Sequence, residues 1–396
     1  MKKILFLGAS QAQMPAIECA KKLGAYIITA DNRPNNPGHK IADENYNIST
    51  VDTEKILLLA HKLKIDAIIS YASDPGALTA AIVSQELNLK SSGVNAVKIL
   101  SNKNAFRNFL KENSFNVPDF LSSNNLKFLE DNFFNKKSIL KPVDSSGSKG
   151  VFIINNKDDL KNYFAKALKF SNTKEVILEE FIEKKFKQIH GEGFFANGHF
   201  KYLILGDQYF SSKKNPVPIS TIFPSEYHKD IMSRVVEELE KALNLLNYYG
   251  PLNIEVIRDK EDKIYLLELG PRSGGNFMLE LAGFYYNQDL ICYQIKDILD
   301  KKNHPAVLKQ PKTTNYYGQL ILNSPKDGIF KGINIPKYFK KILMQKIYYN
   351  PGDQISKYKN SGDVVGVIIF KFENIKEAEE FIYDMRYWKW IELENN

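Results

Sequence analysis

The chain has 396 residues, more than one ordinary hydrophobic core holds, so two or three domains are expected. Hydrophobic residues make up 43% and charged residues 25%, which is the composition of an ordinary globular protein. The formal charge of +8 comes from lysines scattered among acids, so a nucleic-acid-binding tail is disfavoured and an anionic small-molecule partner is compatible.

Targeting and cysteine signals are weak. No apolar run reaches the roughly 18 residues that span a membrane, and the N-terminal ILFLG is too short for a signal peptide, so a cytoplasmic protein is expected. Cys19 and Cys292 lie far apart in helix-like patterns. We expect them to serve packing rather than metal binding or catalysis.

Residues 1–95 alternate strand and helix patterns, which predicts a parallel α/β sheet. Sites in such sheets lie beyond the carboxyl ends of the strands. Here those ends are followed by three loops: Gly8–Gln11, Asp31–Arg33 and Ser73–Gly76. An acid 23 residues after a glycine also suggests a dinucleotide site, but the second and third glycines of GxGxxG are missing, so this interpretation is weak.

A lysine and a glycine-rich hairpin follow. Lys103 comes after the helix-capping candidates Ser101 and Asn102, and a cation at a helix start is unfavourable unless an anion or solvent answers it. In SILKPVDSSGSKGVFII, two strands flank a loop that can fold its N–H groups over an anion. A mobile surface hairpin is the alternative, and the Walker A pattern does not match.

Several further elements are predicted between residues 176 and 300. EEFI follows a short strand, and Asn197-Gly198 predicts a hairpin. His190 has no companion at metal-ligand spacing, so a structural role is favoured. The stretch 211–224, with two lysines and three prolines, is predicted to be a loop, either a lid over an acidic substrate or merely exposed. One amphipathic helix is expected over 227–246, and helices again over 277–300.

The stretch IYLLELGPRSGG is the strongest single signal. Glu268 ends a strand-like run, and thirteen residues upstream PLNIEVIRD supplies Glu255 in another. The charged link 259–263 predicts an antiparallel hairpin that sets the two carboxylates side by side. Such carboxylates repel unless a cation lies between them, and oxygen ligands suit Mg²⁺ bridging to phosphates. A solvated hairpin face is the alternative.

In their order along nearly the whole chain, the motifs SNK, LKPVDSSGSKGV, EEFI, NIEV and LLELGPRSGG, preceded by an α/β domain, resemble the ATP-grasp superfamily. Its carboxylate–amine ligases, with a layout like biotin carboxylase or carbamoyl-phosphate synthase, are the nearest type. The resemblance implies an α/β and α+β chain with three parts. These are a Rossmann-like pre-grasp domain (1–100), an ATP-grasp domain (101–304, with a small lid subdomain roughly at 113–180) and a C-terminal α+β subdomain (305–396).

The resemblance also implies site residues and cofactors, ATP and Mg²⁺ or Mn²⁺. Lys103 and Lys141 would bind phosphates, and Glu255 and Glu268 the metal. Lys141, Glu268 and Arg272 would be catalytic, with Arg272 orienting the substrate carboxylate. The nucleotide would meet a larger set: Ser145, Ser146, Gly147, Ser148, Gly150, Glu179, Glu180, Phe181, Ile182, Glu183 and Glu192. The substrate would meet Arg272, Ser273, Gly274 and Asn276. The partners would be a small carboxylate and a small amine, with neither nucleic acid nor membrane, and a homodimer stays open.

One departure concerns the metal. The family usually has asparagine two residues after the second glutamate, where this chain has Gly270. A water, a substrate oxygen or Asn276 would have to replace it, or one ion is held more weakly.

The resemblance leaves three functional hypotheses. The first is a ligase that forms an amide through an acyl phosphate and releases ADP. The second is an enzyme of nucleotide metabolism that activates formate or bicarbonate, and the third is an ATP-binding regulatory protein without turnover.

Overall fold

A computed structural model describes residues 1–211, 217–300, 306–335, 341–383 and 390–394. Its N-terminal part is a parallel four-stranded sheet. The strands, in order across the sheet, are β3 (Glu44–Tyr46), β2 (Tyr26–Ala30), β1 (Lys3–Leu7) and β4 (Ala67–Ile69).

Helices cover both faces of this sheet, because its strands are apolar on both sides. Ile4 and Phe6 pack toward one face, whereas Leu5 and Leu7 pack toward the other. The helices of this part are α1 (Met14–Lys22), α2 (Pro37–Ile41), α3 (Thr53–Leu63) and α4 (Asp74–Glu86). The parallel α/β unit predicted for residues 1–95 is therefore confirmed.

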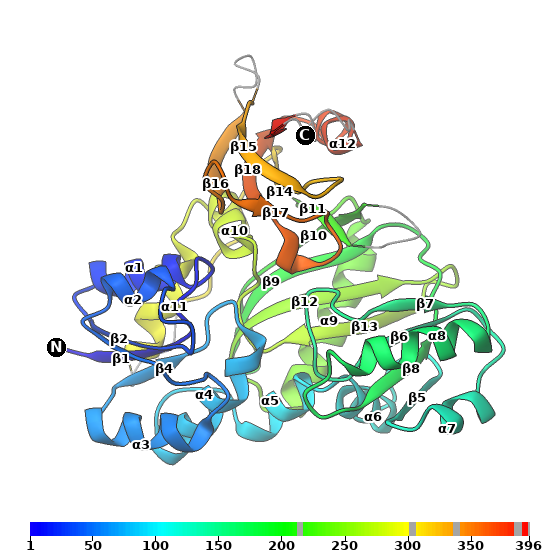
Figure 1. The fold of residues 1–396 in the computed structure, drawn as a ribbon, viewed down its shortest axis with the longest axis horizontal. Coiled ribbons are helices and arrows are strands. Elements are labelled where there is room, and N and C mark those ends of the chain that lie inside the picture. The colour runs from blue at the N-terminus through cyan, green and yellow to red at the C-terminus, as the bar shows by residue number, and fades with distance from the viewer. Residues whose placement is uncertain (212–216, 301–305, 336–340, 384–389, 395–396) are drawn as a thin grey trace.

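Two helices, α5 (Val94–Leu100) and α6 (Lys103–Glu112), lead into a small antiparallel sheet. Asn102 caps α6 as predicted, since its side-chain oxygen accepts from the Ala105 N–H at 3.0 Å. The small sheet has the order β5 (Phe120–Ser123), β8 (Val176–Glu180), β6 (Ser138–Pro142) and β7 (Phe152–Ile154), with α7 (Leu126–Asp131) and α8 (Lys157–Leu168) packed on it. Figure 1 shows it at the opposite side of the molecule from the N-terminal sheet.

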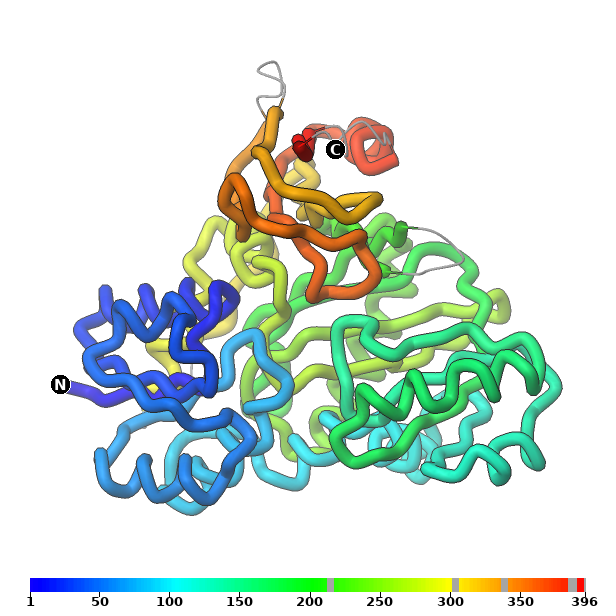
Figure 2. The backbone as a smooth tube through the Cα atoms, viewed as in Figure 1, coloured from blue at the N-terminus to red at the C-terminus, as the bar shows by residue number. Residues whose placement is uncertain are grey.

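An eight-stranded antiparallel sheet lies between them (Figure 2). Its order is β13 (Ile264–Gly270), β12 (Gly250–Arg258), β9 (Gln188–Ala196), β10 (His199–Phe210), β11 (Pro218–Phe223), β14 (Tyr316–Leu322), β18 (Gly366–Phe372) and β16 (Ile342–Ile347). Helix α9 (Lys229–Leu245) contributes Val235, Leu239 and Leu243 to the apolar cluster that includes Leu252 and Ile254 of β12. Each such fully buried aliphatic side chain is worth ~1.5–3 kcal/mol.

The remaining elements complete the two ends of this sheet. Helices α10 (Met278–Tyr286) and α11 (Leu290–Leu299) pack with α1 in one apolar cluster. The last part adds a small sheet of β17 (Gln354–Ile355), β15 (Gly328–Ile333) and β19 (Ile391–Leu393), with α12 (Ile375–Tyr383) and the short 3₁₀ helix η1 (Ser361–Asp363). Within the described ranges, no helix is both long and apolar enough to cross a membrane.

Two expectations were wrong. The stretch 218–223, predicted to be loop because of its prolines, is strand β11, paired on both sides with β10 and β14. Pro218 stands at the first strand position, where a missing N–H is tolerated, and Ile219–Phe223 is rich in β-formers. Residues 212–216 of that loop lie outside the described residues, as does the boundary predicted at 304–305.

The cysteines do more than pack. Cys19 of α1 and Cys292 of α11 form a disulfide, with their Cα atoms 5.7 Å apart across 273 residues of sequence. The disulfide therefore links helix α11 covalently to helix α1, which packs on the N-terminal sheet. The pairing is invisible to spacing rules, because only the fold brings α1 and α11 together.

Candidate active site

The paired carboxylates lie where the hairpin pattern predicts them. Strands β12 and β13 are antiparallel, and Glu255 stands directly opposite Glu268. Burial alternates along β12, with Leu252, Ile254 and Val256 buried under α9 and the intervening side chains on the other face. The prediction of an adjacent pair is therefore confirmed in register, and the pair faces away from the α9 core.

The pair is electrostatically unfavourable without a cation. Burial, and then the neighbouring charge of Glu268, raise the pKa of Glu255 well above its usual range. Gln188 donates to one Glu255 oxygen at 3.1 Å. No cluster of three or more metal-ligating side chains occurs in the described ranges. Two carboxylates fit Mg²⁺, which takes one or two protein oxygens and completes its shell with phosphates and water.

Lys103 connects this pair to the glycine-rich loop. Its ammonium nitrogen lies 3.4 Å from a Glu268 oxygen and donates to the carbonyl of Ser145 at 2.6 Å. The first turn of α6 and the strand β13 thus bring a cation to the carboxylates. Lys103 has an internal acidic partner here, and that partner is itself a candidate metal ligand.

Lys141 lies in a buried ion triad. Its nitrogen is 2.6 Å from one oxygen of Glu179, and Nε of Arg107 is 3.0 Å from the other. Burial raises the pKa of Glu179, but the two cations outweigh burial and hold it below its usual value. Burial lowers the pKa of Lys141 despite Glu179. Glu179, expected to meet the nucleotide, contacts these two cations, and its role toward a nucleotide stays a prediction.

Sequence reasoning missed Arg107. Its side chain is fully buried, and it also donates to the carbonyls of Leu266 and Leu267, so it ties α6 to β13. A signal existed: Arg107 is on the apolar face of α6, beside Phe106 and one turn after Lys103. A charge on the buried face of an amphipathic helix needs a partner.

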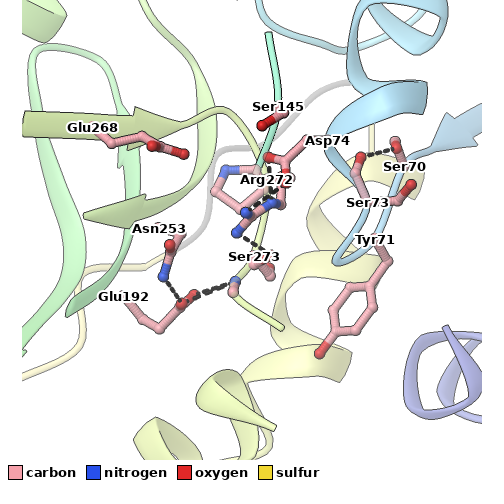
Figure 3. A network of polar contacts seen from close by, with 12 residues as sticks. Ser70, Tyr71, Ser73, Asp74, Ser145, Glu192, Asn253, Glu268, Arg272 and Ser273 are labelled. Carbon is pink, nitrogen blue, oxygen red and sulfur yellow. Dashed lines mark hydrogen bonds and ion pairs between the residues drawn. The ribbon is translucent and has the colours of Figure 1, made fainter. Parts of the chain in front are cut away.

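The glycine-rich loop 144–150 touches two other parts of the chain. The carbonyl of Gly147 accepts from the Ser361 N–H at 3.2 Å, and a hydrogen bond from Ser146 lowers the pKa of Asp74. Ser148 and Gly150 take left-handed backbone angles, with φ of 60° and 73°. Figure 3 shows Ser145 above the Arg272–Asp74 pair, so the loop lies over the site.

Arg272 is held by the N-terminal sheet. Its Nε and Nη2 atoms donate to the two oxygens of Asp74, at 2.7 and 2.8 Å (Figure 3). Asp74 begins α4, within the loop 73–76 that was predicted to face the site. A Cβ at Gly270 would lie 3.4 Å from the guanidinium carbon of Arg272. The place of the family's asparagine is thus covered by Arg272.

Glu192 contacts the loop 272–276 that follows β13. It is fully buried, and both of its oxygens accept from the Gly274 N–H, at 2.9 and 3.1 Å, while Asn253 donates to one at 2.9 Å (Figure 3). Burial raises the pKa of Glu192 to about 7. A Cβ at Gly274 would lie 2.1 Å from a Glu192 oxygen, so a larger residue would force Glu192 or the loop to shift. Ser273 donates to Gln294 of α11 at 2.9 Å.

The remaining predicted residues stand apart from this cluster. Glu180 pairs with Lys136, and the exposed Glu183 pairs with Lys260. The Phe181 N–H is used by the Lys137 carbonyl at 2.9 Å, and no described contact engages Ile182. Their roles toward a nucleotide stay predictions. Asn276 lines a small cavity with Tyr71 and Glu280.

His190 is buried and engaged at both ring nitrogens, by Thr221 at 2.9 Å and Asn253 at 3.0 Å. Burial, followed by the charge of Arg272, lowers its pKa to about 4. A neutral histidine with two partners agrees with the structural role that was favoured.

Comparison with known proteins now decides the family. A family model described as an ATP-grasp domain matches residues 100–276, which include the lysines, the glycine-rich loop and both carboxylates. Residues 100–276 of the chain are therefore an ATP-grasp domain.

Relatives and solved structures resemble the chain beyond this domain. The chain is 27% identical over 308 residues to a formate-dependent phosphoribosylglycinamide formyltransferase of Prochlorococcus marinus (strain MIT 9515), covering 72% of this chain and 74% of the relative. An L-amino acid ligase from Bacillus licheniformis shares the fold, with a TM-score of 0.82 at 18% identity over 100% of this chain and 99% of that one. A phosphoribosylglycinamide synthetase from Anaerococcus prevotii gives 0.77 at 21% identity over 100% of both chains.

The predicted family and ATP-grasp fold are therefore confirmed, and the predicted class of enzyme, an ATP-grasp ligase, agrees with these relatives. The domain boundaries stay predictions. Strands β14, β18 and β16 continue the sheet that begins with β13, so the boundary at 305 coincides with no break in hydrogen bonding.

Proposed function

We propose that this chain activates a small carboxylate with ATP as an acyl phosphate and joins the acyl group to a small amine, with release of ADP and phosphate. The observation that supports this most is the opposed pair Glu255 and Glu268 beside Lys103. Two opposed acids next to a lysine and a glycine-rich loop suit a metal–triphosphate better than any uncharged ligand.

Each residue of the cluster has a role in this proposal. Glu255 and Glu268 would hold Mg²⁺ or Mn²⁺, which supplies positive charge to the phosphates when bound. Lys103 and Lys141 would bind the phosphates. Lys141 would leave its ion pair with Glu179 to do so. The loop 145–150 would cover them and keep water from the acyl phosphate. Arg272, held by Asp74, would present its remaining N–H groups to the substrate carboxylate.

The reaction balances as two displacements. A carboxylate oxygen attacks the γ-phosphorus, the bond to the bridging oxygen breaks, and ADP leaves with its electron pair. The amine nitrogen then attacks the acyl carbon, phosphate leaves, and the nitrogen loses a proton. Lys103, Lys141 and Arg272 offset the repulsion of two anions in the first step, which is the main electrostatic barrier.

A second candidate is activation of formate for transfer to a ribose-phosphate amine. It is favoured by the relatives named formate-dependent phosphoribosylglycinamide formyltransferase, which match 72% of this chain at 27% identity. Formate is itself a carboxylate, so the chemistry at Lys103, Glu268 and Arg272 is the same. The two candidates differ in the size and polarity of the carboxylate and of the amine that the site binds.

The test is ADP release from the purified chain with ATP and Mg²⁺. A panel pairs formate, bicarbonate and larger carboxylates with amines, and hydroxylamine serves as a trapping amine. We expect a carboxylate to stimulate ADP release and to yield a hydroxamate with hydroxylamine. Release of AMP, or ADP release that no carboxylate stimulates, contradicts the proposal. Stimulation by formate alone selects the second candidate.

A further inference from the structure

A small cavity is lined in part by Gly274 and Asn276 of the loop 272–276. It has a volume of about 10 Å³, and its walls come from four separate segments of the chain. Ala12 follows β1, Tyr71 follows β4, Asn276 and Glu280 lie at the start of α10, and Tyr348 follows β16. A volume of this size holds one water-sized group.

The residues that line this cavity offer hydrogen-bond acceptors, and none of them has a basic side chain. Glu280 is half-buried, and no basic side chain or hydrogen-bond donor from another residue meets its carboxylate among the described residues. The phenol oxygen of Tyr71, a side chain only 5% exposed, has no hydrogen-bond partner in the described structure. Burial, and the charges of Glu192 and Asp289, raise the pKa of Glu280 to about 8.

These groups select a compact cation with several N–H donors. A carboxylate and a phenol oxygen both accept, and the rings of Tyr71 and Tyr348 offer negative faces. A metal ion is a poorer occupant, because Glu280 is the one carboxylate among the residues that line this cavity. An ammonium group has about the volume of a water, but it carries a positive charge and donates three hydrogen bonds without accepting any.

The backbone around the cavity is strained. Asn276 and Phe277 take consecutive left-handed conformations, with φ of 52° and 61°. Two such residues in a row, one of them aromatic, are costly without a reason in the fold or the site. They turn the chain from Gly275 into α10 and so set Glu280 at the cavity wall.

Tyr71 links this cavity to Arg272. It also lines a larger cavity of about 100 Å³ whose wall includes Pro271 and Arg272. Figure 3 shows Tyr71 on the same side of the site as Ser70 and Ser73, with its hydroxyl pointing away from Arg272. An anion site and a cation site therefore lie on either side of one aromatic side chain.

We infer that the carboxylate substrate is an amino acid, whose ammonium group enters the cavity of Glu280 and Tyr71 while its carboxylate faces Arg272. The inference rests on the proposed function and names its substrate class. Glu280 is then a binding residue for the substrate, separate from the metal and phosphate groups.

The test compares amino acids with deaminated acids of the same carbon skeleton in the ADP-release assay. We expect an amino acid to exceed its deaminated analogue at least tenfold in kcat/KM. Glu280→Gln should reduce that preference to below threefold by raising KM for the amino acid, with KM for ATP unchanged. Glu237→Gln, an exposed acid on α9, is the matched control and should keep the preference.

Further outcomes distinguish failure of the amino-acid inference from failure of the proposed function. If carboxylates stimulate ADP release but amino acids gain nothing over deaminated acids, or Glu280→Gln keeps the preference, the inference is wrong and the proposed function stands. If no carboxylate stimulates ADP release, the proposed function fails. Calorimetric titration with glycine, methylammonium and ammonium chloride tests the cavity without turnover.

In that titration, glycine should bind wild type and lose at least tenfold in affinity with Glu280→Gln. Binding of ammonium or methylammonium equal to that of glycine would assign the cavity to a free amine and overturn the amino-acid assignment. Absence of all binding would overturn the inference. Tyr71→Phe, which keeps the carboxylate, should lose about threefold and guards against a Glu280 variant that fails to fold.

Discussion

The acids on the two sides of Arg272 are neutralised in opposite ways. On the nucleotide side, Glu255 and Glu268 face each other across β12 and β13, and the Lys103 nitrogen lies 3.4 Å from Glu268. On the substrate side, Asp74 is matched by the Arg272 guanidinium and Glu192 by the N–H of Gly274 and the amide of Asn253.

This difference separates binding from positioning. Like charges held side by side store repulsion that a cationic ligand relieves, so the first pair is built to bind. Acids whose oxygens are already satisfied gain nothing from a ligand, and they instead fix the loop 272–276. The carboxylate pair on the nucleotide side should therefore respond to changes of charge, and the loop 272–276 to changes of shape.

The largest expected effect is on the charged side. Glu268→Gln keeps the size of the side chain but removes a metal ligand, so we expect ADP release to fall at least about 100-fold. Thermal unfolding should barely change, because the side chain is half-buried and its nearest cation is 3.4 Å away. Glu261→Gln, in the turn of the same hairpin, is the control. Equal activity of both variants would remove Glu268 from the metal site.

The next effect tests shape. Gly274→Ala would place a Cβ 2.1 Å from a Glu192 oxygen, so Glu192 or the loop that it holds must shift. We expect kcat/KM for the carboxylate to fall about 10- to 100-fold, since a displacement of about 1 Å is enough for such a loss. Nucleotide binding, measured by calorimetry, should stay within about twofold.

Gly275→Ala is the matched control for that variant. A Cβ at Gly275 meets nothing within 4 Å, and its φ lies outside the left-handed region. If both alanine variants behave alike, the contact between Glu192 and Gly274 does not position the loop.

The third effect is on pH. Burial and Glu268 raise the pKa of Glu255, so at mildly acidic pH this ligand is protonated and Mg²⁺ must displace a proton. Affinity for Mg²⁺–ATP should be about tenfold weaker at pH about 6 than at pH about 8, as measured by calorimetry. Glu255→Gln should remove most of this pH dependence along with most of the affinity for Mg²⁺–ATP.

Stability without ligand should run the other way. Glu192 has a folded pKa of about 7 and Glu280 of about 8, both above the ordinary value near 4.5. Across that window the folded chain holds more protons than the unfolded chain, so its unfolding free energy falls as pH rises from about 5 to about 8. Denaturant melts at several pH values measure this, and a rise in stability over the window would contradict the assigned directions.

The smallest effect concerns the covalent link. Cys292 is two residues from Gln294, which holds Ser273, so reduction of the disulfide should loosen the substrate side first. Disulfides typically add about 2–4 kcal/mol, and we expect thiol treatment to lower Tm by several degrees. KM for the carboxylate should rise modestly while KM for ATP is unchanged. A double variant, Cys19→Ser with Cys292→Ser, should be insensitive to thiol.

Local patterns predicted much of this molecule. The cap at Asn102, the strands of the N-terminal sheet and the register of Glu255 with Glu268 all depend on a few neighbouring residues. Partners distant in sequence were out of reach. Arg107 meets Glu179 72 positions later, and Cys19 meets Cys292 only through the packing of α1 on α11. Strand β11 was missed because the sequence does not reveal that β10 and β14 pair with it.

The continuity of the eight-stranded sheet limits how this chain can be divided. β11 is an interior strand only because β14 pairs with it through Ser220, Thr221, Ile222 and Phe223. A fragment cut to the 100–276 match would keep every charged group of the nucleotide side and yet present β11 as a bare edge. Exposed edges of this kind recruit other chains. Activity studied in isolation would then be limited by aggregation rather than by chemistry, so the C-terminal strands are part of what keeps the site usable.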